Sequence, residues 1–243
     1  MNVRIKRYFR RGIGILLGLV FISQLYILIR IYWIASCVIP TPSMSPTLLE
    51  GDYIVTDMQI PGRRILKNSE DGKGKIIVCR KKGGRDIRKG DVVVFNFPYA
   101  EREDKMVLSM KRFYCKRCVA VPGEKYGFTK DGLKDTFYIP GKGDQLKITE
   151  KNYMHYYKCI EYETGKSIIM KNGLVYCGDS VINQYRFCSN YYFMCGDNVE
   201  NSYDSRYWGM LPEDFILGVG RFIWLSKDKK TGKIRWNRIF TKI

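Results

Sequence analysis

Ser43 is the first residue of this chain whose setting suggests chemistry. It stands in the proline-rich segment from Ile39 to Gly51, which reads IPTPSMSPTLLEG. Pro40 and Pro42 each fix a backbone φ angle and exclude helix, so the chain should run extended and rigid past Ser43. Such a segment could present a serine nucleophile to an extended peptide, but serine, threonine and proline are also common in linkers.

A serine nucleophile needs a base beside it. The one histidine, His155, lies in Tyr153-Met-His-Tyr-Tyr157, which fits a packed aromatic patch better than a catalytic triad. A lysine can act as the base when burial in apolar surroundings lowers its pKa. Most lysines of this chain lie in charged or glycine-rich runs, and Lys116 does not.

Lys116 lies in an apolar, strand-like segment from Tyr114 to Val121. Alternation along a strand places Lys116 on one face with uncharged neighbours and turns Arg117 to the other face. The same alternation separates Cys115 from Cys118, so this Cys-x-x-Cys pair is not expected to form a redox or zinc site. We therefore regard Lys116 as the candidate base.

A second pair of motifs lies near the C-terminus. Ser226-x-x-Lys229 and Lys230-Thr-Gly232 match motifs of penicillin-binding proteins, but those motifs should lie far apart in sequence. Here they overlap in what we expect to be one solvent-exposed hairpin, and we reject them. The eight cysteines show no paired zinc pattern, and we expect no metal and no cofactor.

The polar block from Gly196 to Gly209 reads GDNVENSYDSRYWG and follows an apolar segment. Such residues bond to their own backbone, so the block alone would be interpreted as a turn rich in Asx residues.

The N-terminus has the pattern of a membrane anchor. Residues 1–11 are basic, and 12–29 form an apolar run whose polar members are Ser23 and Gln24. Eighteen helical residues span about 27 Å, close to the hydrocarbon thickness of a bilayer. We predict an anchor over 12–35, with residues 1–11 in the cytoplasm and everything after Trp33 outside.

Two alternatives to an uncleaved anchor are a cleaved signal peptide and a lipoprotein signal. The apolar run is longer than the core of a cleaved signal peptide, which has about 7–15 residues. The segment Ile34-Ala-Ser-Cys37 resembles a lipobox, but Arg30 interrupts the apolar stretch before it. Either outcome leaves Ser43 beside the membrane, and lipidation of Cys37 stays open.

The sequence of the rest of the chain predicts many short strands. We expect an all-β catalytic domain over 36–124 and 191–243, with a smaller accessory β region inserted at 125–190. The clearest hairpin is at 167–176, because Asn172-Gly173 suits a type I′ turn. The predicted strands are 52–56, 76–79, 89–95, 114–121, 191–194, 218–225 and 233–240, and a variable loop separates the first two.

The net charge of +18 first suggests nucleic acid, but no nucleic-acid-binding motif accompanies it. A basic surface near anionic lipid explains the charge more simply.

Three blocks taken together resemble the type I (leader) signal peptidases. They are PTPSMSPTL with Gly51-Asp52, RKGDVVVF with YCKRCVAVPGE, and GDN…NSxDSRYWG, in this order along the chain. The matching blocks cover roughly 36–56, 88–124 and 191–243. The resemblance implies a fold of coiled β-sheets after one transmembrane helix, and a membrane-bound serine endopeptidase that removes signal peptides from exported preproteins.

The resemblance also implies roles for individual residues. Ser43 would be the nucleophile, Lys116 the general base, and Thr41 with the Ser43 N–H the oxyanion hole. Ser202 would orient the lysine amine, and four residues would form a supporting ion-pair network: Asp204, Arg206, Arg117 and Asp197. We expect shallow apolar substrate pockets formed by Ile39, Met44, Leu48 and Tyr114. Val199-Glu200 departs from the Arg-Asp usual in the family.

The expected partners are signal peptides and the lipid bilayer, with no nucleic acid, and the chain is expected to be monomeric in the cytoplasmic membrane. Two other functions stay open at this point. One is a specialised Ser-Lys processing protease with a narrower set of substrates, and the other is an inactive, membrane-tethered binding module.

Overall fold

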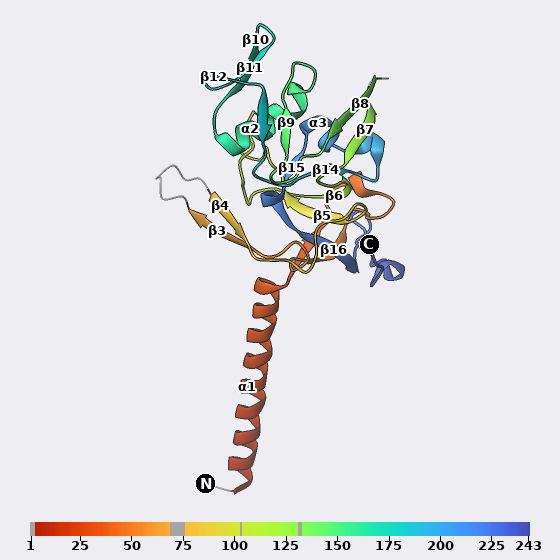
Figure 1. The fold of residues 1–243 in the computed structure, drawn as a ribbon. Coiled ribbons are helices and arrows are strands. Elements are labelled where there is room, and N and C mark those ends of the chain that lie inside the picture. The colour runs from red at the N-terminus through yellow and green to blue at the C-terminus, as the bar shows by residue number, and fades with distance from the viewer. Residues whose placement is uncertain (1–2, 69–75, 103, 131–132) are drawn as a thin grey trace.

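A long N-terminal helix leads into a β-rich body in the computed structural model (Figure 1), which describes residues 3–68, 76–102, 104–130 and 133–243. The helix α1 spans Val3–Tyr32. Its segment Arg10–Leu28 is long and apolar enough to cross a membrane, and none of that segment is buried by the rest of the chain. Ile34 and Ala35, which lie within the predicted anchor, instead begin strand β1.

The body is organised around one antiparallel sheet of seven strands, in the order β1-β2-β16-β5-β6-β14-β15. The strands come from both ends of the chain: β1 (Ile34–Val38), β2 (Asp52–Asp57), β5 (Val92–Asn96), β6 (Phe113–Ala120), β14 (Tyr191–Cys195), β15 (Leu211–Pro212) and β16 (Ile216–Ser226). The C-terminal strand β16 lies between β2 and β5, so the two predicted parts of the catalytic domain share one sheet.

Strand β5 is buried on both faces, as its continuous apolar sequence predicted. Val93 and Phe95 belong to the larger hydrophobic cluster, and Val92 and Val94 belong to a smaller one that also contains Ile39 and Met44. The sheet therefore has a core on each side, and the smaller core lies under the Ser43 segment.

The described part of the predicted loop between residues 56 and 76 contains a strand. Strands β3 (Arg64–Asn68) and β4 (Ile76–Arg80) pair as an antiparallel hairpin, visible at the left of the body in Figure 1.

Residues 125–190 form small sheets above the main one, and in the described part of the chain none of their strands joins it. Asn172 and Gly173 both have positive φ, which confirms the predicted turn. The strands here are β7 (Lys125–Lys130), β8 (Leu133–Tyr138), β9 (Gln145–Lys147), β10 (Ile168–Lys171), β11 (Leu174–Cys177), β12 (Ser180–Ile182) and β13 (Gln184–Arg186).

Two predictions about secondary structure are wrong. The accessory region contains a helix, α2 (Tyr153–Thr164), which buries Tyr156, Cys159 and Ile160. The predicted strand 233–240 is absent: that stretch contains the short 3₁₀ helix η4 (Trp236–Arg238). The described residues contain four other short helices: η1 (Pro42–Met44), η2 (Val199–Asn201), α3 (Ser205–Trp208) and η3 (Glu213–Phe215).

Candidate active site

Ser43 lies on the connection between β1 and β2, in the short 3₁₀ helix η1. Thr41 and Ser45 on either side are extended, as predicted, but between them the segment makes one tight turn rather than running straight. Pro42 is the first residue of that turn, where a proline needs no N–H donor. Ser43 is buried to 8 % exposure, with Met44 packed below it in the smaller core.

Lys116 reaches Ser43 from strand β6. Its Nζ donates a hydrogen bond of 2.5 Å to Ser43 Oγ, across 73 positions of sequence. Lys116 is only 4 % exposed, and it pairs across the sheet with Val93 of the buried strand β5. Burial lowers the pKa of Lys116 below its ordinary value of 10.5, and nearby acidic groups only partly oppose that shift.

The strand alternation inferred from sequence is confirmed. Cys118 lies in the larger core, while Cys115 packs against the smaller one, so the two thiols point to opposite faces. Burial raises the pKa of each thiol to about 12, which keeps both protonated at neutral pH. Arg117 turns away from Lys116, as predicted, toward Asp197.

Two further groups hold Ser43 and its neighbours. The Thr41 hydroxyl lies 3.3 Å from Ser43 Oγ, within hydrogen-bonding distance of it. The Asn198 backbone N–H donates to Ser43 O at 3.1 Å, and its side-chain amide donates to Pro42 O at 3.3 Å. Asn198 was not among the predicted site residues. Its place in the Gly196-Asp-Asn block was the signal that could have identified it.

Ser202 is 7 % exposed and lies close to the Ser43 backbone. Within the described residues its hydroxyl makes no hydrogen bond to Lys116, so its predicted role in orienting the amine stays a prediction. Gly196 separates Ser202 from the Ser43 backbone. A Cβ added to Gly196 would overlap both Ser202 Oγ and Ser43 O.

Gly196→Ala is therefore expected to lower kcat at least tenfold, because the added methyl group must push Ser43 or Ser202 out of place. Steady-state kinetics together with the circular dichroism spectrum would measure this effect. Gly84→Ala is the matched control, since its Cβ would meet only Gln59 O at 3.9 Å. Equal kcat values for the two variants would contradict the prediction.

The predicted supporting network consists of two separate bidentate ion pairs. Arg117 donates to Asp197 at 2.7 and 2.6 Å, and Arg206 donates to Asp204 at 2.8 and 2.7 Å. Asp204 also accepts from the Gly196 N–H at 2.9 Å, which fixes the wall beside Ser202. Arg206 donates a further bond to the backbone oxygen of Val199, so the substitution at 199 leaves this contact in place.

A cavity of about 320 Å³ opens beside Ser43 and Lys116. Ile39, Met44 and Tyr114 line it, as expected of substrate-pocket residues. Leu48 does not: it is completely buried in the smaller core, so its predicted place in the pocket wall is wrong for this cavity. The cavity also has walls that the sequence did not indicate, formed by Phe113, Asn201 and Tyr203.

His155 lies outside this cavity, on α2. Its ring stacks on Phe137 at 4.6 Å, and its Nε2 lies 3.2 Å from Asp135 Oδ1. The aromatic-patch interpretation is confirmed. The expectation that Ser226 lies in an exposed hairpin is wrong. Ser226 is fully buried, and its hydroxyl donates a hydrogen bond to Asp52.

Comparison with known proteins points to the same family. A family model described as "Signal peptidase, peptidase S26" matches residues 13–225. A signal peptidase I of Aquifex aeolicus is 31% identical over 231 residues, covering 86% of this chain and 82% of the relative. A signal peptidase IB of Staphylococcus aureus is 32% identical over 174 residues, covering 71% of this chain and 78% of the relative.

A signal peptidase I of Pseudomonas fluorescens is 27% identical, covering 82% of this chain and 68% of the relative. The family match includes the Ser43 segment, strand β6 and the block that carries Asn198 and Ser202. The chain belongs to the signal peptidase family, peptidase S26, and is a serine endopeptidase.

Proposed function

We propose that this chain removes signal peptides from exported preproteins, with Ser43 as nucleophile and Lys116 as general base. The observation that carries the proposal is the 2.5 Å contact between the buried Lys116 amine and the Ser43 hydroxyl. The relatives compared above are named signal peptidase I or signal peptidase IB. An inactive binding module would have no need to keep a lysine buried against a serine, because burial disfavours the charged amine.

The reaction follows from this geometry. Neutral Lys116 accepts the proton of Ser43 as Oγ attacks the carbonyl carbon of the scissile bond. The Thr41 hydroxyl and the Ser43 N–H would donate to the oxygen that becomes negative, and each such donor is worth roughly 3 kcal/mol. Lys116 then passes its proton to the leaving amine. Water, deprotonated by the same lysine, releases the signal peptide from Ser43.

The substrate would lie in the cavity lined by Ile39, Met44 and Tyr114. Its small apolar volume suits the short side chains that precede a signal-peptide cleavage site. Ser202 would steady the lysine amine, and the ion pairs of Arg117 and Arg206 would hold the strand and the turn on which the site is built.

A membrane anchor accounts for the helix α1 and for the apolar segment Arg10–Leu28. We propose that the basic residues 1–11 stay in the cytoplasm and that the β-rich body lies on the outer side, following the positive-inside rule. That placement would hold Ser43 near the bilayer, where the end of a signal peptide emerges. We expect a monomer whose basic surface contacts anionic lipid.

Activity should rise with pH on the acid side of the profile. The base works only when neutral, and burial lowers the pKa of Lys116, so the neutral fraction grows at a lower pH than for an exposed lysine. A plot of log kcat/KM against pH should therefore level off clearly below the ordinary lysine value of 10.5. A limb that keeps rising to 10.5 or beyond would contradict a buried base.

Cleavage of a purified preprotein tests the function itself. The full chain in detergent or lipid should release one product whose new N-terminus, found by sequencing, directly follows a small-x-small sequence. Failure to cut a preprotein at such a site, with the chain folded and in lipid, would refute the proposed function.

A further inference from the structure

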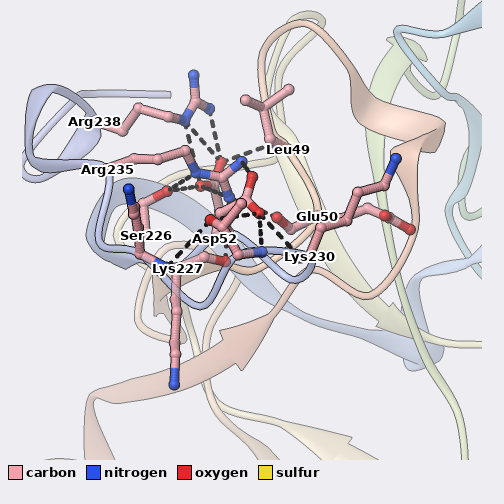
Figure 2. Close-up of polar contacts among 11 residues, drawn as sticks. Leu49, Glu50, Asp52, Ser226, Lys227, Lys230, Arg235 and Arg238 are labelled. Carbon is pink, nitrogen blue, oxygen red and sulfur yellow. Dashed lines mark hydrogen bonds and ion pairs between the residues drawn. The ribbon is translucent and has the colours of Figure 1, made fainter.

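Asp52 is a buried carboxylate that the chemistry at Ser43 does not use. It begins strand β2, directly after the Ser43 segment ends at Gly51, and its exposure is 0%. A carboxylate this deep is stable only when its charge is compensated. Figure 2 shows what surrounds it: residues of the Ser43 segment together with residues of the C-terminal segment, which is defined as residues 226–243.

The C-terminal segment supplies most of the compensation. Arg238 donates to Asp52 Oδ2 at 2.7 Å, Ser226 Oγ donates to Asp52 Oδ1 at 2.6 Å, and Arg235 lies at 3.5 Å. Burial alone would raise the pKa of Asp52, but the bonds from Arg238, Ser226 and the Leu49 N–H hold it below its ordinary value. Asp52 therefore stays charged and keeps both arginines beside it.

The same cations also bind the backbone of the Ser43 segment. Arg238 donates to Thr47 O at 2.9 Å, and Arg235 donates to Glu50 O at 2.6 Å. Lys229 donates to Pro40 O at 2.7 Å, on the other side of Ser43. Three carbonyl groups that flank the nucleophile in sequence are thus satisfied by side chains from the end of the chain.

The two segments also touch directly through their backbones. Gly51 has a φ of +84°, and a Cβ there would overlap Lys227 O, so only glycine allows this approach. The Lys227 N–H donates to Gly51 O at 2.9 Å.

The contacts continue from the C-terminal segment toward the strand of Lys116. Thr47 accepts from Arg238 through its backbone oxygen, and its hydroxyl accepts from Arg117 at 3.3 Å. Arg117 is the neighbour of Lys116 in β6 and is fixed by Asp197. Thr47 therefore joins the Asp52 cluster to the strand that carries the proposed base.

We propose that the C-terminal segment 226–243 is a positioning element for the nucleophile, anchored on Asp52, and that Arg238 is its principal positioning residue. The inference rests on the proposed role of Ser43. All of this segment lies beyond the family match, which ends at residue 225. Arg238 touches no reacting atom; it acts by holding Thr47 and Asp52, and so the segment that sets where Ser43 Oγ stands.

Arg238→Gln in the full chain tests this proposal. Glutamine cannot make both the Asp52 and the Thr47 contacts, so kcat for preprotein cleavage should fall about 10- to 100-fold, as expected for a displaced reacting group. KM should change much less than kcat, because the cavity residues outside the Ser43 segment, such as Tyr114 and Tyr203, are not held by Arg238. Arg221→Gln is the matched control, since Arg221 is exposed on β16 and removing it costs the same charge.

A double-mutant cycle with Asp52→Asn separates positioning from independent effects. If both residues act through one cluster, the double variant should be no slower than the slower single variant. Assays run well below each variant's measured unfolding temperature keep loss of fold out of the comparison. Arg238→Gln with the kcat of Arg221→Gln, or losses that multiply in the double variant, would overturn the proposal.

Ser43→Ala in the same assay separates the two hypotheses. If Ser43→Ala is inactive and Arg238→Gln is fully active, only the positioning role fails. If Ser43→Ala still cleaves, the proposed role of Ser43 as nucleophile is refuted, and the positioning role that rests on it is refuted as well.

Discussion

Ser43→Ala is expected to lose at least about 1,000-fold in kcat for preprotein cleavage, because the variant has no oxygen to form the acyl-enzyme. The fold should survive. Ser43 is a small residue in a tight turn, and its backbone oxygen would still accept from the Asn198 N–H. Single-turnover cleavage of a purified preprotein, followed by gel and mass analysis, would measure the loss.

Ser180→Ala is the matched control for that experiment, because Ser180 lies exposed on the small strand β12 of the accessory region. Its activity should equal that of the unaltered chain. Substantial cleavage by Ser43→Ala, with the product end at the usual site, would mean that another group attacks the bond.

The contact between Ser43 and Lys116 could be predicted from the sequence because each partner has a local signature. Two prolines mark the Ser43 segment as rigid, and alternation along β6 separates Lys116 from Arg117. Val92 to Phe95 likewise read as a strand buried on both faces, and both cores are present. The pattern of apolar residues is enough to predict a strand when the residues packed against its two faces need only be apolar.

The prediction of a strand at 233–240 is wrong for a reason that the sequence does not show. Arg235 and Arg238 both turn toward Asp52, which is more than 180 positions earlier. Side chains at i and i+3 share a side of a 3₁₀ turn but point to opposite faces of a strand. The buried carboxylate therefore selects the turn η4, and no local pattern reveals that partner.

Helix α2 was missed because its sequence, YMHYYKCIEYET, is rich in tyrosine, which favours strands. Its buried residues Tyr156, Cys159 and Ile160 have helical spacing, but that pattern is short. Leu48 was misplaced for a similar reason: an apolar residue near a nucleophile can line the pocket or support it from below. Only the packing of the smaller core distinguishes the two.

Lys116→Arg should be as inactive as a variant that lacks the amine altogether, with a loss of at least about 1,000-fold in kcat. Arginine keeps the positive charge and can still donate hydrogen bonds, but it does not give up its proton at any pH that the fold survives. The result therefore isolates proton transfer from charge. A lysine that only attracted substrate or stabilised the fold would be replaced by arginine at little cost.

Lys111→Arg is the matched control for this substitution. Lys111 lies just before β6, is exposed, and forms an ion pair with Glu101 at 2.8 Å that arginine can also make. Its cleavage rate should be unchanged. The pH profile adds a second test, because any residual activity of Lys116→Arg should lack the acid-side rise assigned to the buried amine. If Lys116→Arg cleaves as fast as Lys111→Arg and with the same pH profile, then Lys116 is not the base, and the short contact with Ser43 Oγ serves only to hold the nucleophile in place.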